Sequence, residues 1–556
     1  LSSAIIFDLA VWITCQPIIA LLTTWQWVSH ASPRPPFAQW IKDHMRLYEL
    51  KRLFRLPFTL FDPSYLANTL IHTPAHVVSG GGLYQALRAP IRPRDEQELA
   101  EVVQQAVNTG NTISVQGAGL SQGQQFVPAA TPGKDKAPWI LDLSLLTLRA
   151  LNSEKASCQP GSMTVTAHAH ATWHEVQQII APHGLALPVM QASNIFSVGG
   201  SVSTNIHGWN HHQGSLCNHI ASIRVMDSTG TICTITPSDA DFGKIVGGFG
   251  RYGILLDVTL KLIPNRSVVL QSKMVTLENY IDDFQQNIKE NPKIAMHVGR
   301  LPIQAPEWWS SDTCPMICSM WNYHDCSSHK EFIAPNKKEN TPVVSEILLN
   351  AMMRIPLVKK AFWHREVRNE TRANNPPQTL NQTMNFAIHP MLRKSQSSEQ
   401  YWLQEYFLPE EKIVAFTKQL GNLLHKNNVA LINASIRFVK AEVQKTAMPY
   451  AKEDRYALVI CWKQSMRNYA IEHTRQWVQT AIDQALNLNG TYYLPYQHFA
   501  TQAQFDKAYP MASELICNRK HLKTVFENGL GLYLQPPKTG LWDLNRGIDK
   551  MKGFLK

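Results

Sequence analysis

The sequence lacks the patterns that mark several classes of protein. It has no Cys-x-x-Cys pair and no Cys/His spacing of the zinc type, and its nine cysteines are scattered along 556 residues. An odd, scattered set favours reduced thiols over a disulfide framework. The cluster Cys314, Cys318, His324, Cys326 and His329 matches no common ligand pattern, so we predict no metal site.

The sequence also has few charged residues and no compositionally biased segment. Only 17% of the residues are charged, 44% are hydrophobic, and no low-complexity tract is present. This composition and length fit two or three globular domains. The formal net charge of +11 favours an anionic partner, such as an acidic membrane surface or a phosphorylated substrate. Because no stripe of alternating basic and aromatic residues occurs, nucleic acid is not expected as a partner.

Residues 1–30 contain a hydrophobic run, Ala4 to Val28, that is long enough to span a bilayer. Basic residues accumulate in residues 31–75, so the positive-inside rule predicts a membrane-associated protein with its body on the cytoplasmic side. The apolar spacing in residues 31–75 predicts an amphipathic helix, either on the bilayer surface or packed on the protein itself. Since the sequence starts at Leu1 rather than Met, a signal peptide stays open as an alternative.

Three glycine-rich stretches follow one another between residues 116 and 253. The first, Gln116 to Gln124, comes directly after a strand-like run, and its backbone N–H groups can form a nest for a phosphate. The second, Ser197 to His219, combines glycines with small hydroxyls and imidazoles, so it should wrap a polar ligand. The third, Gly247 to Gly253, opens into a strand expected over residues 254–263.

The order of these stretches resembles the FAD domain of the vanillyl-alcohol-oxidase-like (PCMH-type) flavoproteins. In that family the first loop holds the pyrophosphate, the second lines the flavin, and the third closes the domain. The words from Ile206 to His219 resemble the oxidative subunit of the decaprenylphosphoryl-ribose epimerase, and sugar and aldonolactone oxidases are broader relatives. The resemblance implies that FAD contacts Gly117, Ala118, Gly119, Leu120, Ser121, Gln122, Ser197, Gly199, Gly200, Ser203, Asn205, His207, Gly208, Gly250, Gly253 and Ile254. Many relatives carry a flavin-linked histidine where Leu120 stands, so non-covalent FAD is expected.

The expected fold class is α+β, with a two-subdomain FAD-binding domain at residues 76–266 and a substrate domain at residues 267–490. Residues 491–556 should return to the FAD domain. Asp95 is a candidate cap for a helix over residues 96–108.

The substrate domain should hold an antiparallel sheet covered on one side by helices. Residues 308–375 look like an insertion or a mobile lid. The strand-like pieces are residues 293–300, 401–409, 430–440 and 456–462, and the amphipathic helices are residues 411–426 and 466–486.

Four residues are catalytic candidates. A flavin oxidises an alcohol by accepting hydride at N5, so the protein must orient the C–H bond and remove the hydroxyl proton. Glu405 and Arg437 are charges inside strand-like runs; the alternative is a structural ion pair on an exposed face. By resemblance, His207 lies beside the flavin, and Tyr496 replaces the epimerase subunit's catalytic lysine. Trp209 stands where that subunit has a phosphate-region lysine.

These observations predict a membrane-associated FAD-dependent oxidoreductase. It would oxidise a secondary alcohol of a sugar, a sugar-lactone or a lipid-linked sugar by hydride transfer to flavin N5. One alternative is a flavin-dependent reductase of a double bond. Another is a non-catalytic FAD-fold subunit with a partner in a membrane complex.

Overall fold

The computed structural model describes most of the chain after residue 76. The predicted membrane segment and amphipathic linker lie outside the described residues. Within these residues, no helix is both long and apolar enough to cross a membrane. The described residues are 77–83, 85–86, 90–127, 139–151, 154–330, 356–372, 374–385, 399–444, 446–512, 525–528 and 530.

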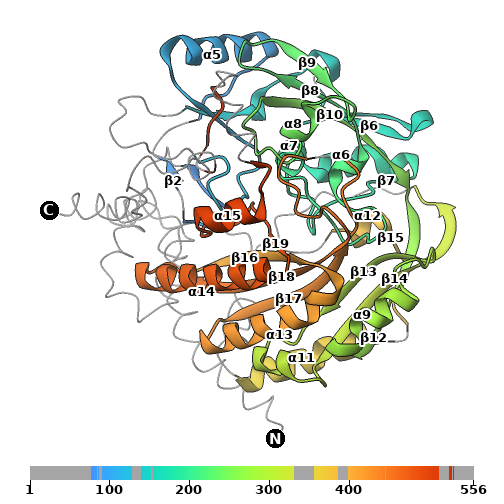
Figure 1. Cartoon of the computed structure of the whole chain (residues 1–556). Helices are drawn as coiled ribbons and strands as arrows, with labels where there is room; N and C mark the ends of the chain where they lie inside the picture. Colours follow the sequence, from blue (N-terminus) through green and yellow to red (C-terminus); the bar gives the residue numbers. More distant parts are fainter. Residues whose placement is uncertain are drawn as a thin grey trace, which may run out of the picture. The chain divides into compact units, whose positions relative to one another are not determined.

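The described part is mixed helix and sheet, in agreement with the α+β prediction (Figure 1). Helix α5 (Glu96–Thr109) is capped as predicted by Asp95, whose side chain accepts a hydrogen bond from the backbone N–H of Glu98. Its buried face packs with a parallel pair of strands, β3 (Ile113–Gln116) and β4 (Trp139–Asp142). Because β3 ends at Gln116, the first glycine-rich stretch begins at the end of this strand.

A five-stranded antiparallel sheet carries the second and third glycine-rich stretches. Helix α7 (Val198–Ser203) lies near the start of the second stretch, and helix α6 (Trp173–Ile180) packs beside it. A Cβ on Gly199 would lie 2.8 Å from the Cβ of Ala169, so only glycine lets α7 approach the end of β6 this closely. In spatial order the strands are β5 (Ala156–Gln159), β6 (Thr164–His168), β10 (Ile254–Lys261), β8 (Ile220–Met226) and β9 (Ile232–Ile235).

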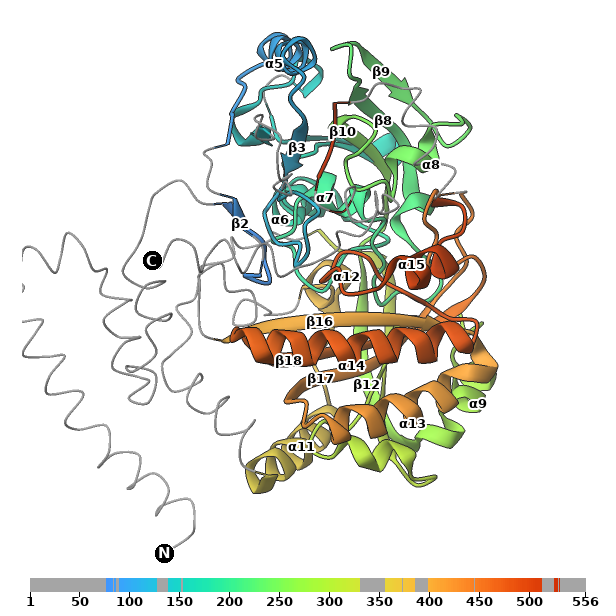
Figure 2. The ribbon, with the colours of Figure 1, turned by 60° about the vertical axis from the view of Figure 1, so that its left-hand side comes forward.

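A larger sheet of eight strands follows in the chain. All four strand-like pieces expected in the substrate domain are strands of this sheet. One face is covered by α9 (Leu277–Asn287), α13 (Glu410–Lys426) and α14 (Asn468–Asn487), and the other faces the glycine-rich stretches (Figure 2). In spatial order the strands are β15 (Gln378–Thr379), β12 (Arg266–Thr276), β14 (Pro315–Ser328), β13 (Ile294–Arg300), β17 (Leu431–Val439), β18 (Arg455–Ser465), β16 (Glu399–Leu408) and β19 (Thr491–Tyr492).

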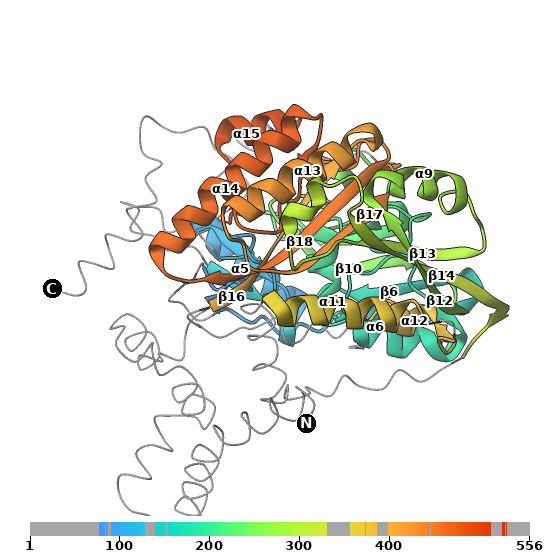
Figure 3. The ribbon, with the colours of Figure 1, turned by 90° about the horizontal axis from the view of Figure 1, so that it is seen from below.

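The expectation of an insertion or lid over residues 308–375 is wrong for β14. This strand lies between β12 and β13 in the interior of the sheet. Met316 and Cys318 enter the core beneath the helices, whereas Trp321 enters the core on the opposite face. Burial on both faces removes the alternating polar pattern that would have marked the strand. Helix α11 (Pro356–Glu370) lies on the other side of the sheet from α13 and α14 (Figure 3).

The remaining elements are short. A segment near the C-terminal end pairs with β3: the N–H of Ile113 donates to the carbonyl of Val525, and the N–H of Glu527 donates to the carbonyl of Ile113. These bonds join a late segment of the chain to β3, beside the first glycine-rich stretch. The short elements are β1 (Val77–Val78), β2 (Gln85–Ala86), β7 (Leu185–Ala186), β11 (Ile263–Pro264), α8 (Phe242–Ile245), α12 (Leu380–Thr383) and α15 (Gln502–Ala508).

Candidate active site

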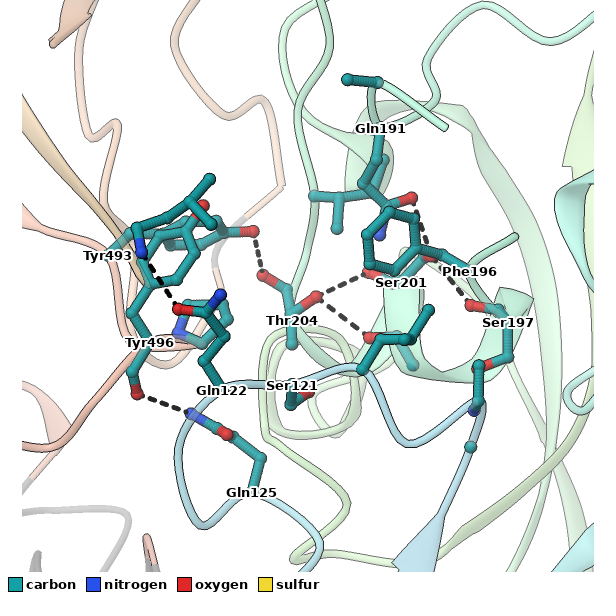
Figure 4. Close-up of a pocket in the computed structure, with 18 of the residues that line it drawn as sticks. Ser121, Gln122, Gln125, Gln191, Phe196, Ser197, Ser201, Thr204, Tyr493 and Tyr496 are labelled. Atoms are coloured by element: carbon teal, nitrogen blue, oxygen red, sulfur yellow. Dashed lines mark hydrogen bonds between the residues drawn. The ribbon is translucent and has the colours of Figure 1, made fainter. Parts of the chain in front are cut away.

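A cavity of about 510 Å³ lies between the three glycine-rich stretches and the open face of the eight-stranded sheet. Figure 4 shows residues of the first two stretches, such as Ser121 and Ser197, facing Tyr493 and Tyr496 from the C-terminal part of the chain. Most residues predicted to bind a cofactor or to act in catalysis line this cavity. They are Gly117, Ala118, Gly119, Leu120, Ser121, Gln122, Ser197, Gly199, Gly200, Ser203, His207, Gly250, Gly253, Glu405, Arg437 and Tyr496.

The first glycine-rich stretch presents free backbone donors to the cavity. In the described part of the chain, the N–H groups of Gly119, Leu120 and Ser121 have no acceptor. The N–H of Ala118 donates to Oγ of Ser197 at 3.1 Å, which ties this loop to the second stretch. Three successive unpaired N–H groups form a nest for an anion such as a phosphate.

Gln122 has a different role from the other predicted contacts. It lines the cavity, but its amide group is engaged within the protein. Its nitrogen donates to the carbonyl of Tyr401 at 2.9 Å, and its oxygen accepts from the N–H of Leu403 at 3.0 Å. Gln122 therefore joins the first glycine-rich stretch to β16.

Three predicted cofactor contacts do not line the cavity. Asn205 has a positive φ of 47° and accepts a hydrogen bond from the N–H of Cys217, so it shapes the second stretch from behind. Gly208 packs against the backbone of Met190, where a Cβ would lie 2.8 Å from the carbonyl oxygen. Ile254 is fully buried in the core beneath α5. These residues act in the scaffold because their backbones or side chains point away from the open space.

The catalytic candidates form a hydrogen-bonded cluster on the cavity wall. Nε2 of His207 lies 2.8 Å from Oε2 of Glu405, and the hydroxyl of Tyr496 donates to Oε1 at 2.5 Å. Glu405 and His207 are each only 5% exposed. The alternative of an ion pair on an exposed face is therefore wrong for Glu405. Arg437 lines the same cavity, and its guanidinium lies over the ring of Trp209.

Electrostatics assign protonation states to this cluster. Burial by itself would raise the pKa of Glu405, but the charges and hydrogen bonds of His207, Arg437 and Tyr496 outweigh it and lower that pKa. Burial, reinforced by the Glu405 carboxylate, raises the pKa of Tyr496 well above its ordinary value. Burial lowers the pKa of Arg437, and Glu405 opposes this effect. Near neutral pH the cluster thus holds an ionised Glu405 and a protonated Tyr496.

The sequence prediction missed several polar residues of the cavity. Asn433 and Ser435 line it beside Arg437 because residues at every second position of β17 face the same way. That alternation could have identified them once Arg437 was chosen. Arg300 and Glu366 also line the cavity, and nothing in their local sequence marks them.

The second glycine-rich stretch is also held from the C-terminal side. Tyr493 lines the cavity, and its hydroxyl donates to the carbonyl of Thr204 at 2.9 Å (Figure 4). The hydroxyl of Tyr450 donates to the carbonyl of Asn205 at 2.6 Å.

Comparison with known families gives a match to the FAD binding domain over residues 88–236. This region is an FAD-binding domain. The cavity fits FAD, because the N–H nest suits the pyrophosphate. The α-carbon of Gly250, at φ 70°, also faces open space, since a Cβ added there would meet no atom within 4 Å.

The chain that carries this FAD-binding domain is similar to several oxidases. It is 33% identical over 115 residues to decaprenylphosphoryl-beta-D-ribose oxidase of Mycolicibacterium smegmatis, covering 20% of this chain and 25% of that protein. It is 31% identical over 174 residues to alditol oxidase of a Streptomyces species, covering 31% and 38%. It is 24% identical over 216 residues to D-arabinono-1,4-lactone oxidase of Yarrowia lipolytica, covering 38% of each. The chain therefore matches 25% to 38% of the length of these relatives.

Proposed function

We propose that the protein is an FAD-dependent oxidoreductase that oxidises a secondary alcohol of a sugar, sugar-lactone or alditol. The observation that carries the proposal is the buried Glu405 carboxylate, bonded to both His207 and Tyr496 on the wall of the cavity. Similarity to oxidases of alditols and lactones supports this reaction class.

When bound, FAD supplies the acceptor for the hydride of the substrate. The chain's own residues manage the proton. The Tyr496 hydroxyl donates a hydrogen bond to Glu405, so the phenol oxygen is free to accept a hydrogen bond from a substrate hydroxyl. A proton can pass from that hydroxyl through Tyr496 to the ionised carboxylate, and His207 holds the carboxylate in place.

Arg437 and Ser435 provide further polar contacts. Nε of Arg437 and Oγ of Ser435 are buried and have no hydrogen-bond partner in the described part of the chain. Both residues line the cavity, so a bound ligand can satisfy them. The positive charge of Arg437 favours an oxygen that becomes negative as its proton leaves.

The test is flavin reduction without oxygen. Protein loaded with FAD is mixed anaerobically with xylitol, sorbitol or an aldonolactone, and the flavin absorbance is followed. Bleaching by at least one of these compounds supports the proposal. Flavin that stays oxidised with all of them, but bleaches with a reduced nicotinamide, would contradict it and favour a reductase.

Two properties of the whole protein belong to the same proposal. The hydrophobic run Ala4 to Val28 and the charge of +11 support membrane association with a cytoplasmic body. By the family resemblance, many relatives carry a flavin-linked histidine where Leu120 stands, and this difference supports non-covalent FAD. If acid precipitation left the yellow colour in the pellet, non-covalent binding of FAD would be contradicted.

A further inference from the structure

One end of the cavity is bounded by a helix outside the FAD-binding domain. Val358, Phe362, Glu366 and Glu370 recur every four residues on α11, so they lie along one side of the helix. Val358 and Phe362 pack on a small apolar cluster of the sheet that includes Ile432. Phe362 and Glu366 line the cavity. The helix therefore presents an apolar part and then an acidic part to the sheet.

Arg300, at the end of β13, holds both carboxylates of this acidic part. Its Nη1 lies 3.0 Å from Oε1 of Glu366 and also bonds Oε1 of Glu370. Oε2 of Glu370 accepts a hydrogen bond from Oγ of Ser319 at 2.9 Å. Both oxygens of Glu370 are thus engaged within the protein, and Glu370 does not line the cavity.

Glu366 differs from Glu370 in what its second oxygen does. Its Oε2 has no donor in the part of the chain that the structure describes, and its side chain is 28% exposed. A carboxylate that is fixed through one oxygen, with the other free at a cavity wall, is an acceptor for a ligand hydroxyl.

The strand register places Arg300, which holds this acceptor, three strands away from Glu405. Arg300 pairs with Ser435, Ser435 with Val459, and Val459 with Glu405, so these residues form one row across four strands. Three strand spacings separate the Cα atoms of Arg300 and Glu405 by about 14 Å. Side chains from both ends reach into this span, and the hydroxyl of Ser435 lies between them. This span favours an extended polyol over a short one.

Charge restricts what this end of the cavity can bind. The guanidinium of Arg300 is offset by two carboxylates, so it leaves no net positive charge for a phosphate. We propose that Glu366 is a specificity-determining residue that accepts a hydrogen bond from a hydroxyl remote from the oxidised carbon, in an uncharged polyhydroxylated substrate. The inference rests on the proposed function. To that function the inference adds Glu366 as the residue that binds the hydroxyl at the far end of the substrate.

The experiment compares Glu366→Leu, Glu366→Gln and Glu370→Leu in the FAD-loaded protein, with glycerol, xylitol, sorbitol and sorbitol 6-phosphate as substrates. Loss of the acceptor in Glu366→Leu should raise KM for xylitol and sorbitol by about 10-fold or more, with little change in kcat or in KM for glycerol. Glu366→Gln, which keeps a polar group, should restore part of the loss. The wild type should prefer sorbitol to sorbitol 6-phosphate.

Glu370→Leu is the matched control, because it removes the other carboxylate on Arg300 but no group at the cavity. An equal rise of KM in Glu370→Leu would mean that Glu366 only holds α11, and would overturn the inference. A wild-type preference for the phosphate would also overturn it. If the wild type oxidises none of these compounds, the proposed function falls too. If it oxidises them with a KM that Glu366→Leu leaves unchanged, only the role of Glu366 is lost. Flavin content and thermal midpoint of each variant identify any that fail to fold.

Discussion

Replacing Glu405 with glutamine is the sharpest perturbation of the proposed mechanism. The amide keeps the size of the side chain but has a single acceptor oxygen where the carboxylate has two. In the native protein, the two oxygens take separate hydrogen bonds from His207 and Tyr496. The amide cannot accept the two hydrogen bonds at separate oxygens, and the base that takes the proton through Tyr496 disappears. Arg437 also loses the nearby negative charge that opposes the lowering of its pKa by burial.

The size of the effect follows from these losses. A hydrogen bond to a charged group contributes about 1.5–3 kcal/mol, and a general base contributes about 10²- to 10⁴-fold to a rate. We expect Glu405→Gln to slow flavin reduction by the substrate by about 10²- to 10³-fold. FAD content should stay near that of the wild type, because the N–H groups of the first glycine-rich stretch do not involve Glu405.

The assay is anaerobic stopped-flow measurement of flavin bleaching at saturating substrate, with FAD content measured on the same sample. Glu399→Gln is the matched control, since Glu399 begins the same strand but pairs with Lys463 and does not line the cavity. It should leave the rate within about twofold of the wild type. A Glu405→Gln protein with full FAD and a rate within twofold of the wild type would refute the role assigned to Glu405.

Three further predictions concern FAD retention, acid stability and membrane attachment. Gly117→Val should prevent FAD retention, because its Cβ would lie 2.4 Å from Oγ of Ser197; Gly161→Val, in open space, should keep a normal flavin spectrum. Burial lowers the pKa of His297 to about 4, so the unfolded chain binds its proton first and stability falls as pH drops from about 6.5 to 4. Measured by urea unfolding over this pH range, the free energy of unfolding of His297→Asn should fall by about 3 kcal/mol less than that of the wild type. An equal fall in both proteins would contradict this. Deleting residues 1–28 should release the protein from membranes in a flotation assay; continued flotation would exclude that segment as the anchor.

Local chemistry in the sequence determined much of the scaffold. The Asp95 cap depends on a backbone N–H three residues away, and the amphipathic helices α13 and α14 depend on spacing within each helix. The glycine-rich stretches depend on the backbone freedom of glycine itself. Each of these signals is set by neighbours in the chain, so it can be read without knowing the fold.

Tertiary structure alone decided how the site is assembled. Glu405 meets His207, 198 residues earlier, and Tyr496, 91 residues later. Arg300 reaches Glu366 only because α11, which follows β14 in the chain, packs on the face of the sheet to which the Arg300 side chain of β13 points. A single-residue shift in strand register would turn Glu405 or Arg300 to the opposite face. The sequence therefore identified charged residues as candidates for catalysis, while strand pairing and packing determined which charged residues share the cavity.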